Sequence, residues 1–291
     1  MKMFSIPNLI TLGNLLCGCL AIVFAFEGNL VWAAYLVGIA AVLDFLDGFV
    51  ARALKQYSEI GKQLDSLADM VTFGVVPGVV MFKLLDYSFR NYHQLSLYDL
   101  SGSIYDLAEA MEYRNHWYSY LPYVGFLIVL FSALRLAKFN IDTRQSDSFI
   151  GVPTPANAIL ICSIPLIYNT YNLMAGNSIF MSRPDVKDPG LISFYKNFPV
   201  DGFAHSVCTF LTNPIFLLVL TILMCYLLIS EIPLFSLKFK SFGWKGNEIR
   251  WSFLTISILL LVTLQFMGIP LAIVLYVLMS VGNNMMRKKG G

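Results

Sequence analysis

The sequence is poor in charge, and this scarcity restricts what the chain can be. Only 13% of its 291 residues are charged, about half the usual share of a soluble globular domain. The formal net charge is +2, and no segment gathers lysine and arginine into the basic surface that a phosphate backbone requires. A nucleic-acid partner is therefore excluded, and a water-soluble domain of this size is not expected.

Cysteine is also scarce and shows no metal-binding pattern. Cys17 and Cys19 are separated by one residue and have no histidine nearby, which does not match the spacing of a zinc finger. Four of the five cysteines lie in or beside apolar stretches, so we interpret them as small buried side chains. The cysteines are Cys17, Cys19, Cys162, Cys208 and Cys225. The sequence predicts neither disulfides nor a structural zinc site.

Apolar residues, in contrast, are abundant and occur in long stretches. They make up 57% of the chain, and the mean hydropathy is +0.67. A helix needs about 20 apolar residues to span a bilayer. Stretches of about this length cover residues 8–26, 30–51, 65–85, 118–138, 153–173, 212–232, 251–267 and 269–285. The sequence thus predicts an all-α, polytopic transmembrane bundle of about eight helices. The last two stretches are short and tightly joined, so they also fit a hairpin that does not cross.

Basic residues indicate how these helices are oriented. The first apolar stretch leads directly into the second without a small-residue cleavage site, so we expect a retained helix rather than a secretory signal. With the N-terminus in the cytosol, fourteen lysines and arginines fall on the cytosolic side and six on the outer side. The six are Lys83, Arg90, Arg114, Arg183, Lys187 and Lys196. This bias follows the positive-inside rule and predicts a protein of the cell (inner) membrane with both termini in the cytosol.

Four aspartates stand at the predicted cytosolic ends of the second and third helices. Asp44 and Asp47 are three residues apart, and Asp65 and Asp69 are four apart, so each pair shares one helical face. The loop between the helices is short, and the helices should therefore be antiparallel neighbours. The two pairs can then converge. A lone acid at a helix end is usually a surface ion pair, but acids within membrane helices are costly and normally functional.

Converging carboxylates favour a divalent metal site. Four of them cannot all stay ionised without a counter-charge, and Mg²⁺ or Mn²⁺ supplies that charge through oxygen ligands. A pair of such ions suits displacement at phosphorus, because it stabilises the attacking and the leaving oxygen together. Gly48 and Ala51 leave room beside the acids, while Arg52 and Lys62 offer positive charge to phosphates. We therefore expect an active site on the cytosolic side.

The residues from Asp44 to Asp69 also carry a resemblance. Eight of these 26 positions, Asp44, Asp47, Gly48, Ala51, Arg52, Gly61, Asp65 and Asp69, match the signature of the CDP-alcohol phosphotransferase family without a departure. The resemblance implies that the four aspartates hold two metal ions and that Asp69 also acts as the base for the incoming hydroxyl. It implies that Gly48, Ala51, Arg52 and Gly61 seat the CDP group. It further implies a homodimer with six core helices.

On this basis we expect a single membrane domain over 1–291. Its core would cover about 4–232, and the helices of about 251–285 would be a C-terminal addition.

Four segments resemble the bacterial and archaeal phosphatidylserine synthases within that family. They are residues 6–18, 65–74, 134–140 and 149–156. This resemblance implies that the chain transfers a phosphatidyl group from CDP-diacylglycerol, a membrane lipid, to L-serine and releases CMP. The same chemistry with glycerol 3-phosphate or an inositol phosphate is the alternative. A divalent-cation transporter is a further alternative, but its acids should lie near mid-membrane rather than at helix ends.

Two further residue pairs are candidates for substrate binding. Arg135 and Lys138 share a face at the cytosolic end of the fourth helix, and arginine binds a carboxylate such as that of serine through two hydrogen bonds. Otherwise they are only topological anchors. Asn8 and Thr11 share a face at the start of the first helix. They either cap that helix or contact the phosphates of the CDP lipid.

Overall fold

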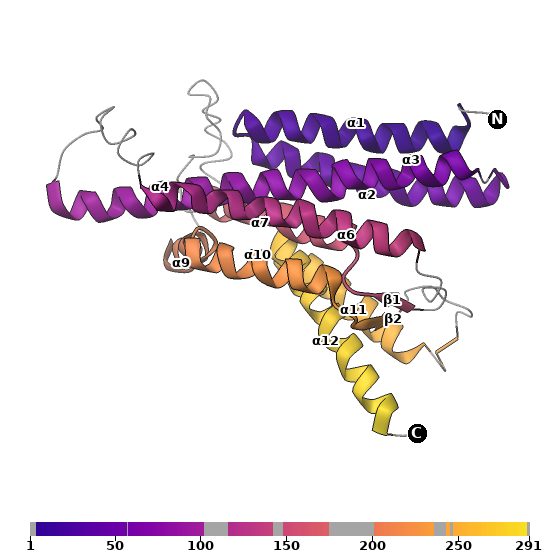
Figure 1. Cartoon of the computed structure of the whole chain (residues 1–291). Coiled ribbons are helices and arrows are strands. Elements are labelled where there is room, and N and C mark those ends of the chain that lie inside the picture. The colour runs from indigo at the N-terminus through magenta and orange to yellow at the C-terminus, as the bar shows by residue number, and fades with distance from the viewer. Residues whose placement is uncertain are drawn as a thin grey trace.

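The fold is helical throughout, apart from two short strands (Figure 1). The computed structural model describes residues 4–56, 58–101, 116–141, 148–174, 201–235, 243–244 and 247–289. The helices are α1 (Ile6–Phe26), α2 (Leu30–Ala53), α3 (Glu59–Asp69), the π-helix η1 (Met70–Val75), α4 (Val76–Ser101), the 3₁₀-helix η2 (Trp117–Phe126), α6 (Leu127–Ile141), α7 (Thr154–Met174), α9 (Asp201–Leu211), α10 (Pro214–Ile229), α11 (Glu248–Leu264), the 3₁₀-helix η3 (Gln265–Met267) and α12 (Gly268–Lys289).

Each predicted apolar stretch falls on one of these helices or on consecutive ones, which confirms the all-α bundle. The strands β1 (Ser148–Ile150) and β2 (Pro233–Phe235) form a small antiparallel pair with Phe149 opposite Leu234. This pair connects the segment before α7 with the segment after α10. Sequence patterns did not predict it, because three-residue strands are too short to show an alternation of apolar and polar residues.

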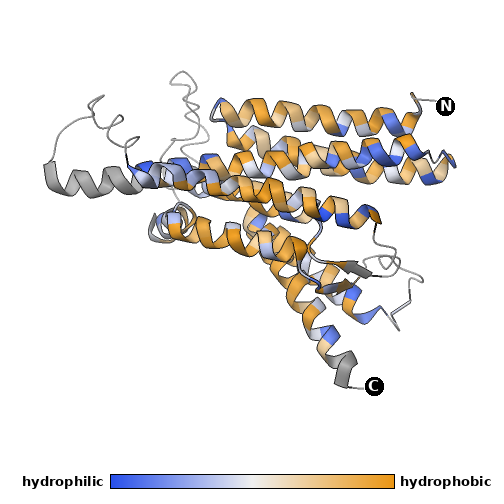
Figure 2. Cartoon of the chain, viewed as in Figure 1, coloured by the Kyte–Doolittle hydropathy of each residue, from blue (hydrophilic) through white to orange (hydrophobic). Residues whose placement is uncertain are grey.

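Five helical stretches in the described part of the chain are long and apolar enough to cross a membrane. They are Ile6–Phe26, Leu30–Ala53, Glu59–Arg90, Trp117–Ile141 and Glu248–Met285. The last of them comprises α11 and α12, which a reversal at Gln265 separates. A sixth is formed if α9 and α10, which meet at an angle of 56°, are counted together. Figure 2 shows apolar residues along the lengths of the helices and hydrophilic residues gathered where α2 meets α3. The chain is an integral membrane protein.

The number of crossings and their orientation stay predictions. The helix α7 has the length of a span, but polar residues such as Asn157 and Asn169 lower its mean hydropathy, and it is not among the five. Several of the basic residues that set the predicted orientation, among them Arg114 and Arg183, lie outside the described residues.

The two C-terminal helices fold back on each other. The rings of Phe253 on α11 and Tyr276 on α12 have centroids 5.4 Å apart, and Gly268 lies directly against the backbone of Leu260. The chain reverses at Gln265, whose φ of 50° lies in the left-handed region. The predicted tight connection is therefore a helical hairpin, and α12 runs obliquely to α1, α2 and α4 (Figure 1).

Small residues allow the helices of the core to approach closely, as is usual for membrane helices. Ala21, Ala25 and Ala33 are fully buried where α1 packs along α2. At the contact between η2 and α4, Gly125 lies so close to Phe82 that a Cβ atom on it would be 2.7 Å from the Phe82 backbone nitrogen.

A methyl group at Gly125 should therefore destabilise the protein. We expect Gly125→Ala to lower the free energy of unfolding by about 1–3 kcal/mol, because backbone atoms cannot move aside cheaply. The check is a thermal unfolding curve in detergent. Gly38→Ala is the matched control, because no atom of the described residues lies within 4 Å of its added carbon, and a helical alanine is slightly favourable there. Equal midpoints for the two variants would contradict this packing.

Candidate metal centre and active site

Three carboxylates from two helices meet at one point. Asp44 and Asp47 come from the last turns of α2, and Asp65 comes from α3, which follows after a short loop. Each side chain offers an oxygen atom, and these three oxygens all lie within 4.8 Å of one another. Both helices pack against α1, and their acidic faces turn toward each other across the carboxylates.

Asp69 adjoins this group from the end of α3. Its carboxyl group interacts with that of Asp44, and its Oδ1 accepts a hydrogen bond from Asn14 Nδ2 on α1 at 3.4 Å. The side chain is half-buried, one turn beyond Asp65. Asp69 thus lies beside the three clustered carboxylates, at the point where α3 becomes the π-helix η1.

The charge of this group calls for a cation. Among the residues that the structure describes, none of the four aspartates has a lysine or arginine nitrogen within 4.0 Å, and the ion pairs found are Arg90–Asp86 and Lys138–Glu231. Like charges at such short separations repel unless a counter-ion intervenes. Closely spaced carboxylate oxygens are the ligands that hard divalent cations prefer. The donor set present therefore fits a divalent metal ion.

Thr11 fixes one of the carboxylates. Its hydroxyl donates to Asp47 Oδ2 at 2.6 Å, with the Pro7 carbonyl at 3.1 Å as an alternative acceptor. Neither Thr11 nor Asn8 caps α1 with its side chain. That role belongs to Ser5, whose hydroxyl accepts from the Asn8 backbone N–H at 3.4 Å. The capping interpretation of Asn8 and Thr11 is therefore wrong, because the helix begins one turn earlier than it would require.

A cavity of about 200 Å³ opens beside the carboxylates. Most of the predicted CDP-binding residues line it, together with three residues that sequence patterns did not single out. Its lining is Pro7, Asn8, Thr11, Asp47, Gly48, Ala51, Gln56, Ser58, Gly61, Lys62 and Asp65. Gln56 and Ser58 belong to the loop between α2 and α3. The one sequence signal for their place in the site is that this loop joins two helices that carry acidic residues. Arg52 is exposed and lies next to Gly48 rather than in the lining.

Gly48 and Gly61, the two glycines that line the cavity, differ in how much space a side chain would have. A Cβ on Gly61 would lie 3.0 Å from both Asn8 Oδ1 and Ser58 Oγ, so the fold itself restricts this position. Near Gly48, Arg52 Nη1 at 3.9 Å is the only atom of the described residues within 4 Å of such a Cβ. The fold therefore leaves space at Gly48, and that space belongs to the cavity.

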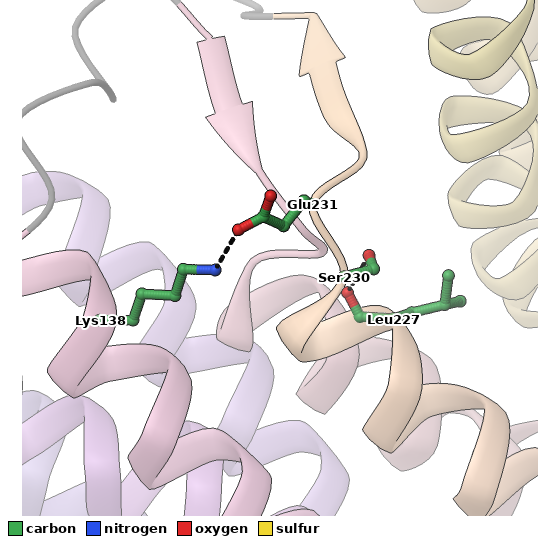
Figure 3. Close-up of polar contacts among 4 residues, drawn as sticks. All are labelled: Lys138, Leu227, Ser230 and Glu231. Carbon is green, nitrogen blue, oxygen red and sulfur yellow. Dashed lines mark hydrogen bonds and ion pairs between the residues drawn. The ribbon is translucent and has the colours of Figure 1, made fainter.

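Arg135 and Lys138 on α6 are directed to different partners. Arg135 is 7% exposed, its guanidinium lies 5.8 Å from the centre of the Phe139 ring, and its charge acts on Asp69. Lys138 instead forms an ion pair of 3.2 Å with Glu231 after α10 (Figure 3), and both side chains are well exposed. Of these two candidates for acceptor binding, Arg135 is the one near the carboxylates.

Comparisons with known proteins agree with this geometry. The model of the CDP-alcohol phosphatidyltransferase family matches residues 4–182. A Helicobacter pylori protein named CDP-diacylglycerol–serine O-phosphatidyltransferase is 34% identical over 184 residues, which cover 62% of this chain and 66% of that protein. A Bacillus subtilis protein of the same name is 32% identical over 175 residues, 59% of this chain and 81% of that one.

An archaeal relative extends the comparison. The archaetidylserine synthase of Methanothermobacter thermautotrophicus is 32% identical over 164 residues, 56% of this chain and 58% of that protein. The matched region thus spans slightly less than two thirds of the Helicobacter relative. The family model covers more than half of this chain and includes the three clustered aspartates and Asp69. The chain therefore belongs to the CDP-alcohol phosphatidyltransferase family.

Proposed function

We propose that this protein transfers the phosphatidyl group of CDP-diacylglycerol to the hydroxyl of L-serine, giving phosphatidylserine and CMP. The observation that carries the proposal is the convergence of Asp44, Asp47 and Asp65 at the edge of a cavity lined by the family's small residues. The names of the bacterial and archaeal relatives support serine as the acceptor. We propose one membrane domain in a homodimer of the inner membrane, with the site and both termini in the cytosol.

The four aspartates would hold two divalent ions, Mg²⁺ or Mn²⁺. When bound, such ions neutralise a pyrophosphate and stabilise charge at the reacting phosphorus. Gly48, Ala51 and Gly61 give the CDP group access to the helix backbones, and Arg52 supplies positive charge at the entrance. Asn8 lines the same cavity, and Thr11 orients Asp47 within it. The chain thus positions the nucleotide with small residues and few fixed charges.

The chemistry then needs one proton acceptor. Asp69 takes the proton of the serine hydroxyl, as a general base placed beside the other carboxylates. The serine oxygen forms a bond to the β-phosphorus while the bond from that phosphorus to the CMP oxygen breaks, and CMP leaves. Asn14 holds the Asp69 carboxyl group in place. Arg135 supplies the cation that a serine carboxylate requires.

The test is an acceptor assay with purified protein in detergent. The mixture contains CDP-diacylglycerol, Mn²⁺ or Mg²⁺ and radiolabelled L-serine, and we expect labelled phosphatidylserine and an equal amount of CMP. Parallel reactions contain glycerol 3-phosphate or inositol phosphate in place of serine. CMP release with one of these acceptors and none with serine would show that the acceptor is another alcohol, while the family assignment would stand. No CMP release with any alcohol would contradict the transferase proposal.

Arg135 and Lys138 should differ in their effect on the acceptor. We expect Arg135→Ala to raise the KM for serine at least tenfold, which corresponds to the loss of a charge-assisted hydrogen bond. Lys138→Ala should raise it by only a few-fold, because the Lys138 ammonium is already paired with Glu231. The measurement is the KM for serine at saturating CDP-diacylglycerol. A larger effect at Lys138 than at Arg135 would contradict the assignment.

A further inference from the structure

In the part of the chain that the structure describes, five polar side chains near the carboxylates are buried without full hydrogen bonding. The atoms without a partner are Asn14 Oδ1, Ser132 Oγ, Arg135 Nε, Thr154 Oγ1 and both amide atoms of Asn157. All five residues are less than a tenth exposed. Folded proteins satisfy more than about 90% of their buried polar groups. Six unpartnered atoms on three neighbouring helices therefore indicate a place that a polar ligand or water fills.

These side chains surround the π-helix η1, which begins directly after Asp69. Asn14 on α1 contacts Asp69, and its backbone carbonyl accepts a hydrogen bond from Thr72 at 3.2 Å. Ser132 on α6 lies against Gly74, where an added Cβ would be 3.3 Å from the Ser132 Cβ. π-Helical turns are rare and occur often at functional sites. The unpartnered atoms therefore gather at an unusual segment next to the proposed base.

The register between α6 and the span formed by α3 and η1 places Arg135 beside the start of η1. The helix α6 runs antiparallel to α3 and η1, with Asn140 hydrogen-bonded to Ser66 at 3.0 Å at one end and Ser132 against Gly74 at the other. Arg135 lies between these contacts, level with the first residues of η1. The action of its charge on Asp69 agrees with this position.

Thr154 and Asn157 approach from α7, which packs against η1 and α2. The helices α7 and α4 run in parallel, and the rings of Tyr168 and Tyr87 are 6.3 Å apart. Because η1 precedes α4 in the same span and α7 also packs against η1, the first turns of α7, which carry Thr154 and Asn157, lie beside η1. The five residues thus form one layer around η1, which we call the buried polar layer.

The buried polar layer offers the hydrogen-bonding groups and the positive charge that would bind an amino acid. Asn157 has an unpartnered amide donor and an unpartnered carbonyl acceptor, and Arg135 adds a cation. A zwitterion needs donors for its carboxylate and acceptors for its ammonium group. We propose that the buried polar layer binds the carboxylate and ammonium groups of the acceptor, with Asn157 selecting an acceptor that carries both. This inference rests on the proposed function with serine.

The first test compares KM values for the two substrates. Asn157→Leu removes both amide atoms at similar volume, and Thr154→Val replaces a hydroxyl by a methyl group. We expect the KM for serine to rise about tenfold or more in Asn157→Leu and about threefold to tenfold in Thr154→Val. The KM for CDP-diacylglycerol should stay within about twofold, because its cavity is lined by other residues. Thr221→Val is the matched control. This threonine on α10 is fully buried, and its hydroxyl bonds to the Leu217 carbonyl of its own helix.

The second test does not depend on turnover. Serine should raise the thermal unfolding midpoint of wild-type protein that holds CMP and Mn²⁺. This rise should disappear in Asn157→Leu and persist in Thr221→Val. If Asn157→Leu does not fold, Thr154→Val and Asn157→Asp serve instead. Asn157→Asp should weaken serine binding as well, because it removes the amide donor for the serine carboxylate and places a negative charge beside it.

The outcomes separate this inference from the proposed function. Wild-type protein that forms phosphatidylserine, together with folded variants whose KM for serine stays within about twofold, would show that the layer holds water only. That result overturns the inference and leaves the function intact. Wild-type protein that neither forms phosphatidylserine nor responds to serine in the unfolding test overturns both.

Discussion

Removal of divalent metal should abolish CMP release from CDP-diacylglycerol. In the described structure, Asp44, Asp47 and Asp65 place their oxygens within 4.8 Å of one another without a basic side chain in ion-pair distance. A cation is therefore needed to make the site compatible with a pyrophosphate, which brings further negative charge. We expect activity to fall to background after treatment with EDTA and to return when Mn²⁺ or Mg²⁺ is added in excess.

The same ions should stabilise the folded protein in the absence of substrate. A ligand present at a hundred times its Kd adds about 2.7 kcal/mol to the free energy of unfolding. Thermal unfolding with and without Mn²⁺ measures this directly. The response should vanish in Asp44→Asn and remain in Asp86→Asn, a matched control whose carboxylate pairs with Arg90. Full activity in EDTA, or an equal Mn²⁺ response in both variants, would contradict a metal centre at the clustered carboxylates.

Substitution of the proposed base should have an effect of similar size. Asp69→Asn keeps the shape of the side chain and removes its ability to accept a proton. We expect the kcat for phosphatidylserine formation to fall about 10²- to 10⁴-fold, the usual contribution of a general base. The KM for CDP-diacylglycerol should change much less, because Asp69 does not line the cavity that the nucleotide is proposed to enter.

The interpretation of Asp69→Asn requires that the metal response is measured alongside. Asp69 adjoins Asp44, and its loss can also weaken ion binding. A variant that has lost kcat but still shows the Mn²⁺-dependent rise in unfolding midpoint supports the role as base. Loss of both identifies Asp69 mainly as a metal ligand. Unchanged kcat would exclude it from either role.

The helices and the acidic cluster were predictable from the sequence because both depend on local patterns. Long apolar stretches identify α1, α2 and α4, and the spacing of Asp44, Asp47 and Asp65 fixes which residues share a helical face. The short loop then requires the two faces to meet. The resemblance to the family was confirmed for the same reason, since its signature lies within these two helices.

Other features depend on tertiary contacts that no local pattern encodes. The ion pair between Lys138 and Glu231 joins residues 93 positions apart, and it separates two side chains that the spacing on α6 suggested would act together. The bond from Thr11 to Asp47 is similarly long-range. The unpartnered atoms of Asn157 depend on how α7 packs against its neighbours. The sequence alone does not show whether an asparagine is buried or hydrogen-bonded.

The π-helix η1 also has a mechanical consequence for the chain. A π-turn holds one residue more than the α-helical turn it replaces, and each residue of an α-helix advances the direction of side chains by about 100°. The extra residue therefore sets the angular phase between the acidic face of α3 and the buried face of α4 within one continuous span. A single deletion between Met70 and Val75 would rotate one face against the other. The carboxylates or the core valines Val79 and Val80 would then turn toward lipid.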